Sequence, residues 1–333
     1  MAAGMARVGW LGPDLARDVV VEVLAGAAEV VDVPLDADAL AAALPDLDAV
    51  VDASTRVPVG AAALAAAPRL RILSLASTGS SHVDADAAAA RGVAVRTLRE
   101  DRDLLADLTP AAEQTWALLL AVARRLPAAA AHARDGGWAR EGFPGLMLRG
   151  RTLGVVGLGR IGGHVARYGA AFGMEVVAHD PVRTDWPDGV RRVDLDELLA
   201  ASDVVTVHVH LDDATRGLLD ADALARCRPG AIVINTSRGG VVDDAAAAAL
   251  VRAGHLGGLG LDVLTLEPPD PDHPVLVAAR ECDTVVVTPH VGGFSPDAVR
   301  LVVQRAAEKV RDALAGAADA AGAADAADAG VSA

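Results

Sequence analysis

The stretch from residue 152 to residue 163, TLGVVGLGRIGG, constrains this chain more than any other. A run of apolar residues predicts a buried strand, and Gly157, Gly159 and Gly162 follow at G-x-G-x-x-G spacing. One such glycine makes a tight turn, one lets the backbone approach a pyrophosphate, and one lets helix and strand pack closely. The helix start then offers free N–H groups and a positive dipole end to phosphates. The stretch therefore predicts a strand, a turn and a helix that bind a dinucleotide.

The residues around this turn strengthen that prediction, because a single G-x-G-x-x-G is weak in a chain with 33 glycines. Residues 165–172 continue at helical period, and residues 175–178 read as a second strand that ends at Asp180. Asp180 follows Gly162 by 18 residues, where a carboxylate can accept hydrogen bonds from an adenosine ribose. The alternative is a glycine-rich turn in another α/β fold.

Charge and composition argue against several classes of partner. The formal charge of −15 disfavours nucleic acid and anionic membranes, since phosphate-binding surfaces need clustered Lys and Arg. There is no uninterrupted apolar run of about 18 residues and no visible secretory signal, so we expect a cytoplasmic protein. Cys227 and Cys282 stand far apart, which predicts neither a disulfide framework nor a metal site.

Short apolar strands alternate with helical segments through most of the chain, which predicts an α/β fold with parallel sheets covered on both faces. The first set of predicted strands is 6–10, 29–33, 49–53, 71–74 and 93–96. After the glycine turn, the second set continues with 190–193, 204–209, 231–235, 258–263 and 284–288. Two parallel sheets follow from these two sets.

The segments outside the strands set the expected domain limits. A helix is predicted over 109–126, with Thr109 as N-cap and Pro110 in its first turn. A helix over 296–314 has no sheet of its own and should return to the first domain, while the Ala, Gly and Asp tail after it should be disordered, with a helical tail as the alternative. We therefore expect residues 1–99 plus 295–315 to form one domain, residues 100–294 to form the dinucleotide-binding domain, and residues 316–333 to form a disordered tail.

Three ionisable residues follow three different predicted strands: Arg238, Glu267 and His290. Because ligands bind at the carboxyl ends of strands in open α/β sheets, these side chains suit one crevice. An arginine can hold a 2-oxo acid with paired hydrogen bonds, and a histidine paired with a carboxylate is a good general acid or base. From the residues alone, each could equally be a surface charge, a loop acid or a packed turn histidine.

The ordered motifs GLGRIGG, HDP, VHVHL, INTSRGG, DVLTLEP and TPHVGG resemble the D-isomer-specific 2-hydroxyacid dehydrogenase family, which includes phosphoglycerate dehydrogenase. The similarity covers roughly residues 45–312. It implies two Rossmann-like, doubly wound domains with the active-site cleft between them, NAD as cofactor, and a homodimer. It also implies hydride transfer between NAD(H) and a small anionic 2-oxo or D-2-hydroxy acid. Residues 1–99 plus 295–315 would then be the substrate-binding domain and residues 100–294 the NAD-binding domain.

The resemblance also implies catalytic, substrate-binding and cofactor-binding roles for individual residues. Arg238 would bind the substrate, His290 would exchange the proton, and Glu267 would be its carboxylate partner. The turn at Thr78 and Gly79 would hold the substrate carboxylate. No metal site is implied. The residues expected to bind the cofactor are Gly157, Gly159, Arg160, Ile161, Gly162, Asp180, His208, Thr236, Asp262 and Gly292.

The chain departs from the family pattern in ways that bear on its substrate. Members acting on phosphoglycerate often have an Arg-Ser-Arg-Thr-like stretch at residues 52–55, where this chain reads DAST, so Ser54 replaces an arginine. The charged segment LREDRDLL at residues 98–105 also differs from the family pattern. Arg96 just before it, and Arg99 and Arg102 within it, are either a source of positive charge for an anionic substrate or solvated.

Three further expectations remain open at the level of sequence. Trp138 resembles a tryptophan that reaches the neighbouring subunit, or it packs in its own loop. Asp180 favours NAD over NADP, although Arg183 nearby keeps NADP as an alternative. An NAD-sensing binding protein of the same fold, like the corepressors related to this family, is the rival to an enzyme; another Rossmann enzyme, such as a formate dehydrogenase, is a third possibility.

Overall fold

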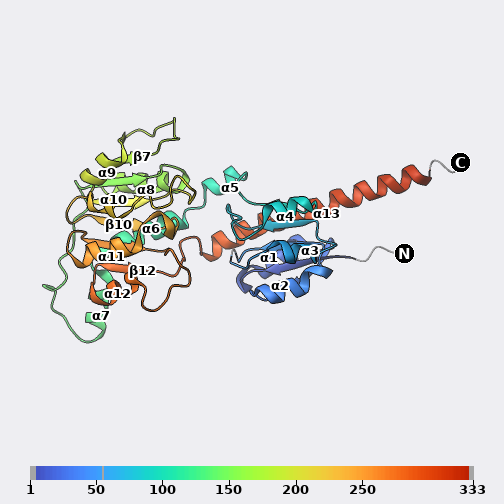
Figure 1. The fold of residues 1–333 in the computed structure, drawn as a ribbon, viewed down its shortest axis with the longest axis horizontal. Helices are drawn as coiled ribbons and strands as arrows, with labels where there is room; N and C mark the ends of the chain where they lie inside the picture. Colours follow the sequence, from blue (N-terminus) through green and yellow to red (C-terminus); the bar gives the residue numbers. More distant parts are fainter. Residues whose placement is uncertain (1–4, 55, 330–333) are drawn as a thin grey trace. The chain divides into compact units, whose positions relative to one another are not determined.

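The computed structural model describes residues 5–54 and 56–329, with side chains through residue 316. It divides into two compact units, Met1–Leu108 with Phe294–Ala333, and Thr109–Gly293 (Figure 1). Each unit is built on a parallel sheet, which confirms the predicted fold class. The first boundary lies after Leu108 instead of residue 99, because the segment before it is tied to the last helix of the first unit.

The first unit contains a five-stranded parallel sheet in the order β2-β1-β3-β4-β5. Helices α1 and α13 cover one face and α2, α3 and α4 the other, each through a cluster of buried Val, Leu and Ala side chains. The strands are β1 (Ala6–Leu11), β2 (Ala28–Asp32), β3 (Ala49–Asp52), β4 (Ile72–Leu75) and β5 (Ala94–Arg96). The helices are α1 (Arg17–Val23), α2 (Ala37–Ala43), α3 (Ala61–Ala65), α4 (Ala85–Ala90), α5 (Arg102–Ala106) and α13 (Pro296–Ala329).

Helix α13 joins the first unit although it follows the second in the sequence. Val299, Val303, Ala306 and Val310 are buried against β1, β3 and α1, and their spacing of three or four residues places them on one helical face. The backbone stays helical to Ala329, where a disordered tail from residue 316 was expected. The high helix propensity of alanine favours this helical alternative; residues 330–333 lie outside the described residues.

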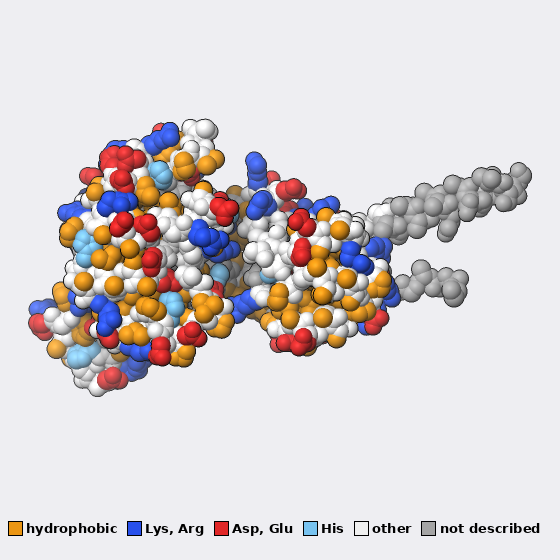
Figure 2. Space-filling view, viewed as in Figure 1, with side chains coloured by type: hydrophobic (Ala, Val, Ile, Leu, Met, Phe, Trp, Pro, Cys, Tyr) orange, Lys and Arg blue, Asp and Glu red, His pale blue; other side chains and the backbone are white. Residues whose placement is uncertain are grey.

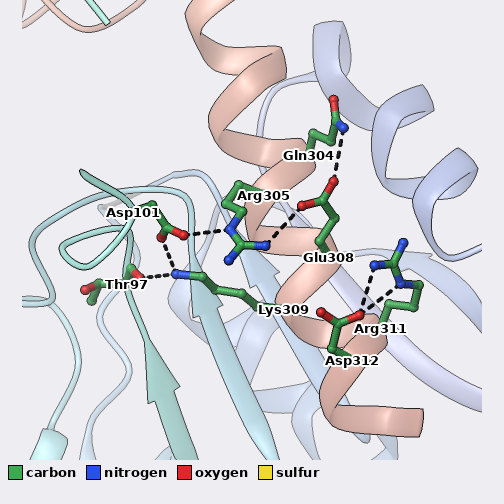
Figure 3. A network of polar contacts seen from close by, with 8 residues as sticks. All are labelled: Thr97, Asp101, Gln304, Arg305, Glu308, Lys309, Arg311 and Asp312. Carbon is green, nitrogen blue, oxygen red and sulfur yellow. Dashed lines mark hydrogen bonds and ion pairs between the residues drawn. The ribbon is translucent and has the colours of Figure 1, made fainter. Parts of the chain in front are cut away.

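A polar cluster ties the loop before α5 to α13 (Figure 3). The Asp101 carboxylate accepts a hydrogen bond from Arg305 Nε at 2.6 Å and another from Lys309 Nζ. Lys309 also donates to the Thr97 carbonyl at 2.6 Å. Partial burial alone would raise the pKa of Asp101, but the hydrogen bonds and charges of Lys309 and Arg305 hold it below its ordinary value.

The second unit contains a seven-stranded parallel sheet in the order β12-β11-β10-β9-β6-β7-β8. Helices α6 and α8 cover one face, and α9, α10, α11 and α12 the other. The strands are β6 (Thr152–Val156), β7 (Glu175–His179), β8 (Val190–Arg192), β9 (Val204–Val207), β10 (Ile232–Asn235), β11 (Gly258–Leu261) and β12 (Val285–Val287). The helices are α6 (Pro110–Ala123), α7 (Leu126–Arg134), α8 (Arg160–Ala171), α9 (Leu195–Ala201), α10 (Ala221–Ala225), α11 (Asp244–Arg252) and α12 (Pro274–Glu281).

The segment from α6 to β6 differs in part from expectation. Thr109 is the N-cap residue of α6, but its side chain caps no backbone N–H and donates instead to Glu113. Helix α7 was not predicted, and none of its residues is buried. Residues 135–150 form a loop, in which Trp138 and Met147 are 92% and 74% exposed.

Charged side chains of both signs are interspersed over the face seen in Figure 2, without one broad basic patch. None of the described helices is long and apolar enough to cross a bilayer.

Candidate active site

The predicted site residues of the second unit follow six neighbouring parallel strands: β6, β7, β9, β10, β11 and β12. The carboxyl ends of parallel strands share one edge of the sheet, so the glycine turn, His208, Arg238, Glu267 and His290 lie along that edge. Strand order reverses between β6 and β9, because β7 and β8 extend one side and β9 begins the other. Ligands of doubly wound sheets bind at such a reversal.

The glycine turn after β6 has the geometry that its sequence demands. Gly157 has a φ of +86°, in the left-handed region that favours glycine. A Cβ on Gly162 would lie 2.0 Å from the Gly157 carbonyl oxygen, so helix α8 can meet the strand only through glycine. A Cβ on Gly159 would meet nothing within 4 Å, which leaves this turn open to a phosphate. Arg160 is exposed and Ile161 half-buried at the start of α8.

Asp180 accepts hydrogen bonds from three backbone amides through both of its oxygens. Leu158 N in the glycine turn donates to Oδ2 at 2.8 Å, and Val182 N and Arg183 N donate to Oδ1 at 3.0 Å each. The Arg183 guanidinium in turn donates to the Leu158 carbonyl. Both residues that bear on cofactor choice therefore contact the glycine turn.

His208 supplies an observation that fits a bound cofactor. Its Nε2 atom is buried without a hydrogen-bond partner in the part of the chain that the structure describes, and burial lowers its pKa to about 3, so the ring is neutral. A buried polar atom needs a partner. The His208 carbonyl lies 2.9 Å from where a Cβ on Gly157 would stand, beside the glycine turn. Thr236, also buried, shares a 2.7 Å hydrogen bond with Thr115.

His290 and Glu267 form the central polar pair of the site. His290 Nδ1 lies 2.6 Å from Glu267 Oε2, and both side chains are partly exposed. Partial burial alone would raise the pKa of Glu267, but the hydrogen bond and charge of His290, the Leu264 N–H and the charge of Arg238 hold it below its ordinary value. Glu267 is therefore an ionised acceptor near pH 7, which places a proton on Nδ1 and leaves Nε2 for proton exchange.

Asp262 organises the turn that carries His290. Its carboxylate accepts hydrogen bonds from Val291 N at 2.9 Å, Gly292 N at 2.7 Å and the Thr288 hydroxyl. The His290 N–H donates to the Asp262 carbonyl at 2.8 Å. His290 has a φ of +55°, an uncommon conformation for a residue with a side chain that surrounding contacts must hold. The buried Asp262 carboxylate supplies those contacts.

Arg238 is exposed at the end of a loop shaped by Asn235. The Asn235 side chain donates to the Arg238 carbonyl at 3.0 Å and accepts from the amide and hydroxyl of Ser237. A Cβ on Gly239 would lie 1.9 Å from the Leu264 carbonyl carbon, so the Arg238 loop and the Glu267 loop are in direct contact. The Arg238 charge is consequently close enough to Glu267 to help lower the pKa of that carboxyl group.

The other predicted residues lie elsewhere. Thr78 and Gly79 belong to the first unit, in the loop after β4, where Ser77 Oγ donates to the Gly79 carbonyl at 2.7 Å. Trp138 packs against neither core cluster of its unit. Among the described residues, no group of three or more His, Cys, Asp or Glu side chains could hold a metal ion.

Sequence reasoning missed one residue that shapes the site, Asn235, and one role of a residue that it named, Asp262. Asn235 ends a buried strand, and asparagine before a turn is a known signal for side-chain bonds to the following backbone. Asp262 was expected to contact the cofactor, and its hydrogen bonds to the 288–292 turn were not foreseen, because they join segments 26 or more residues apart.

The model of the NAD-binding domain of D-isomer-specific 2-hydroxyacid dehydrogenases matches residues 116–292. The chain belongs to the D-isomer-specific 2-hydroxyacid dehydrogenase family. This confirms the resemblance carried by its motifs.

Two curated relatives and one solved structure illustrate the breadth of this dehydrogenase family. D-3-phosphoglycerate dehydrogenase of Mycobacterium tuberculosis is 44% identical over 284 residues, which cover 84% of this chain and 52% of the relative. Hydroxypyruvate reductase of Thermotoga maritima is 33% identical over 85% of this chain and 90% of its own. The structure of TT0316 protein from Thermus thermophilus has a TM-score of 0.83 at 36% identity, covering 93% of this chain and 97% of the other. The chain thus spans about half the length of the phosphoglycerate dehydrogenase that it matches.

Proposed function

We propose that the protein is an NAD-dependent 2-hydroxyacid dehydrogenase that reduces a small 2-oxo acid to the D-2-hydroxy acid, or runs the reverse reaction. The observation that carries this proposal is the His290–Glu267 pair at 2.6 Å, on a turn held by Asp262 at the same sheet edge as the glycine turn. A histidine paired with an ionised carboxylate is suited to exchange a proton with the substrate, which this reaction needs.

The proton transfer is assigned to His290. In reduction, its Nε2 gives a proton to the oxygen that develops negative charge at C2 of the oxo acid, while Glu267 stabilises the protonated imidazole through Nδ1. In oxidation, the same nitrogen removes the hydroxyl proton. Glu267 is suited to this role because its pKa lies below its ordinary value and it stays ionised near neutral pH.

Arg238 is assigned to the substrate. A guanidinium can donate paired hydrogen bonds to the carboxylate and carbonyl oxygens, which orients the oxo acid and stabilises charge on its carbonyl. NADH, when bound, supplies the hydride that C2 accepts. Gly159 would leave room for its pyrophosphate in the turn that Gly157 and Gly162 shape, and the unpartnered His208 Nε2 would face the same ligand.

The proposed substrate carries no terminal phosphate. Asp52 and Ser54 occupy the stretch where phosphoglycerate-specific members often have arginines, and Asp52 is 2% exposed. Its carboxylate accepts from the amide and hydroxyl of Ser54 at 2.7 Å each, and lies 2.8 Å from His82 Nε2. A carboxylate here offers a phosphate no attraction. Small oxo acids such as hydroxypyruvate, pyruvate and glyoxylate are therefore the substrates to test first.

NAD is proposed as the preferred cofactor, because the Asp180 carboxylate would accept hydrogen bonds from a free ribose and repel a 2′-phosphate. Asp180→Ala should raise the KM for NADH by a larger factor than the KM for NADPH. Equal factors would count against the ribose role. The comparison must be made at saturating 2-oxo acid, so that only cofactor binding varies.

A homodimer is proposed through the segment from α7 to β6. Helix α7 has no buried residue, and Trp138 and Met147 are 92% and 74% exposed. Large apolar side chains gathered on one protruding segment mark an interface. Analytical ultracentrifugation should give a dimer for the wild type, and a Trp138→Ser, Met147→Ser double variant should shift it toward monomer; a wild-type monomer would refute this assignment.

The activity is tested by NADH oxidation with hydroxypyruvate, pyruvate, glyoxylate and 3-phosphohydroxypyruvate. We expect turnover with at least one unphosphorylated acid and a lower kcat/KM for the phosphorylated one. His290→Ala serves as the inactive control. NADH binding without turnover on any acid would favour the NAD-sensing alternative, and preference for the phosphorylated acid would overturn the substrate assignment.

A further inference from the structure

Asp244, the first residue of α11, is a buried carboxylate outside the predicted site. Its Oδ2 accepts a hydrogen bond from Thr265 N at 2.8 Å. Thr265 belongs to the loop between β11 and Glu267, and Leu264 N, the preceding amide, donates to Glu267 Oε1 at 3.1 Å. Two successive amides of one loop are thus bound by two carboxylates, one buried in the unit and the other paired with His290.

This loop has little freedom on its other side. A Cβ on Gly239 would lie 1.9 Å from the Leu264 carbonyl carbon and 2.3 Å from Thr265 N. The loop therefore rests directly on the backbone that follows Arg238. The position of Glu267 therefore depends on two contacts of this loop: its packing against Gly239 and the hydrogen bond from the Thr265 amide to Asp244.

A second side chain supports Asp244. His273 Nε2 lies 3.4 Å from the same Oδ2, and His273 Nδ1 accepts from Val275 N at 3.4 Å. The proton of His273 is therefore on Nε2, directed at Asp244. The other carboxylate oxygen, Oδ1, is buried without a partner among the described side chains and backbone. Burial raises the pKa of Asp244.

We propose that Asp244 is a positioning residue: through the Thr265 amide it holds the loop that presents Glu267 to His290. The inference rests on the proposed function, since it assigns Asp244 a role in proton transfer that touches neither substrate nor cofactor. Burying the Asp244 carboxylate costs free energy, since one of its oxygens has no partner among the described residues. Its hydrogen bond to the Thr265 amide gives a reason for keeping an acid at this position. Removing the carboxylate would leave the Thr265 N–H unsatisfied and release the loop.

The test compares Asp244→Ala, Asp244→Asn and the matched control Asp243→Ala. Asp243 is the N-cap of the same helix, where its side chain accepts a hydrogen bond from Ala246 N, and among the described residues no hydrogen bond joins this side chain to the Glu267 loop. Asp244→Ala should lower kcat by ~10-fold, narrow the pH range over which reduction is fast, and leave the KM for NADH within about twofold. Asp244→Asn keeps an acceptor for Thr265 N and should restore most of kcat. Asp243→Ala should lower thermal stability without changing the pH profile.

Hydrogen exchange separates failure of this inference from failure of the proposed function. In Asp244→Ala, the peptide spanning residues 262–267 should exchange faster than in the wild type, and in Asp243→Ala it should not. An unchanged pH profile and kcat in Asp244→Ala, or equal exchange in both variants, overturns the positioning role. If the wild type reduces no 2-oxo acid, the exchange comparison still decides whether Asp244 holds the loop.

Discussion

Replacing Asp101 by asparagine tests whether the polar cluster in Figure 3 contributes to the stability of the first unit. The Asp101 side chain is 9% exposed, Lys309 15% and Arg305 41%. Losing a partner costs about 3–5 kcal/mol for a buried pair and about 0–1 kcal/mol for an exposed one. When Asp101 loses its charge, water can reach the exposed Arg305 guanidinium but not the more buried Lys309 ammonium. We therefore expect a cost between the two limits, with Asp101→Asn lowering the free energy of unfolding by about 2 kcal/mol.

The effect should depend on pH in a defined direction. Because the folded-state pKa of Asp101 lies below its ordinary value, its charge stabilises the fold above the unfolded pKa of about 3.9 and loses this effect as the pH falls through the folded pKa. Wild type and Asp101→Asn should therefore differ fully at pH 7 and converge in acid.

Lys309 is the only lysine of the chain. The extent of amine labelling of the Lys309 peptide, measured by mass spectrometry at increasing urea concentrations, therefore reports the unfolding of the first unit alone. Asp312→Asn is the matched control, since Asp312 and its partner Arg311 lie on the same helix and are 61% and 47% exposed. We expect the control to change stability by less than about 0.5 kcal/mol. Equal urea midpoints for Asp101→Asn and Asp312→Asn would refute the argument from burial.

Three predictions concern the active site. His290→Ala should lower kcat for 2-oxo acid reduction by ~10²- to 10⁴-fold, and an unchanged kcat would remove His290 from the mechanism. Glu267→Gln removes the charge that stabilises protonated His290. As the pH rises, the rate of 2-oxo acid reduction should therefore begin to fall at a lower pH in this variant than in the wild type. An identical pH profile would contradict the pairing. Gly162→Ala, whose Cβ would lie 2.0 Å from the Gly157 carbonyl oxygen, should weaken NADH binding by more than ~10-fold in fluorescence titration, and tight binding would show that the turn can adjust.

Much of the fold could be predicted because it rests on local patterns. Short runs of Val, Ile and Leu bounded by Gly, Asp or Pro gave the two parallel sheets. Helix α7 escaped prediction because it buries no residue, so no apolar period marks it. The helical end of α13 was only the alternative expectation, because its alanine-rich sequence favours helix but has no apolar period to mark one.

The site was predictable where its residues follow strand ends, as Arg238, Glu267 and His290 do. The hydrogen bonds that hold these residues were not. Asp262 reaches the His290 turn, and Asp244 reaches the Glu267 loop, across 21 or more residues of sequence. Such contacts depend on which strands become neighbours and on loop geometry, which residue spacing alone does not determine.

The three amide bonds of Asp180 bear on how cofactor preference could be altered in this chain. The carboxylate expected to accept hydrogen bonds from the ribose also accepts one from the Leu158 N–H, inside the glycine turn itself. A substitution that admits a 2′-phosphate therefore removes an acceptor that this turn requires. Exchange of NAD for NADP by design would need two coupled changes: a new acceptor for the Leu158 amide, and a cation such as Arg183 freed from the Leu158 carbonyl.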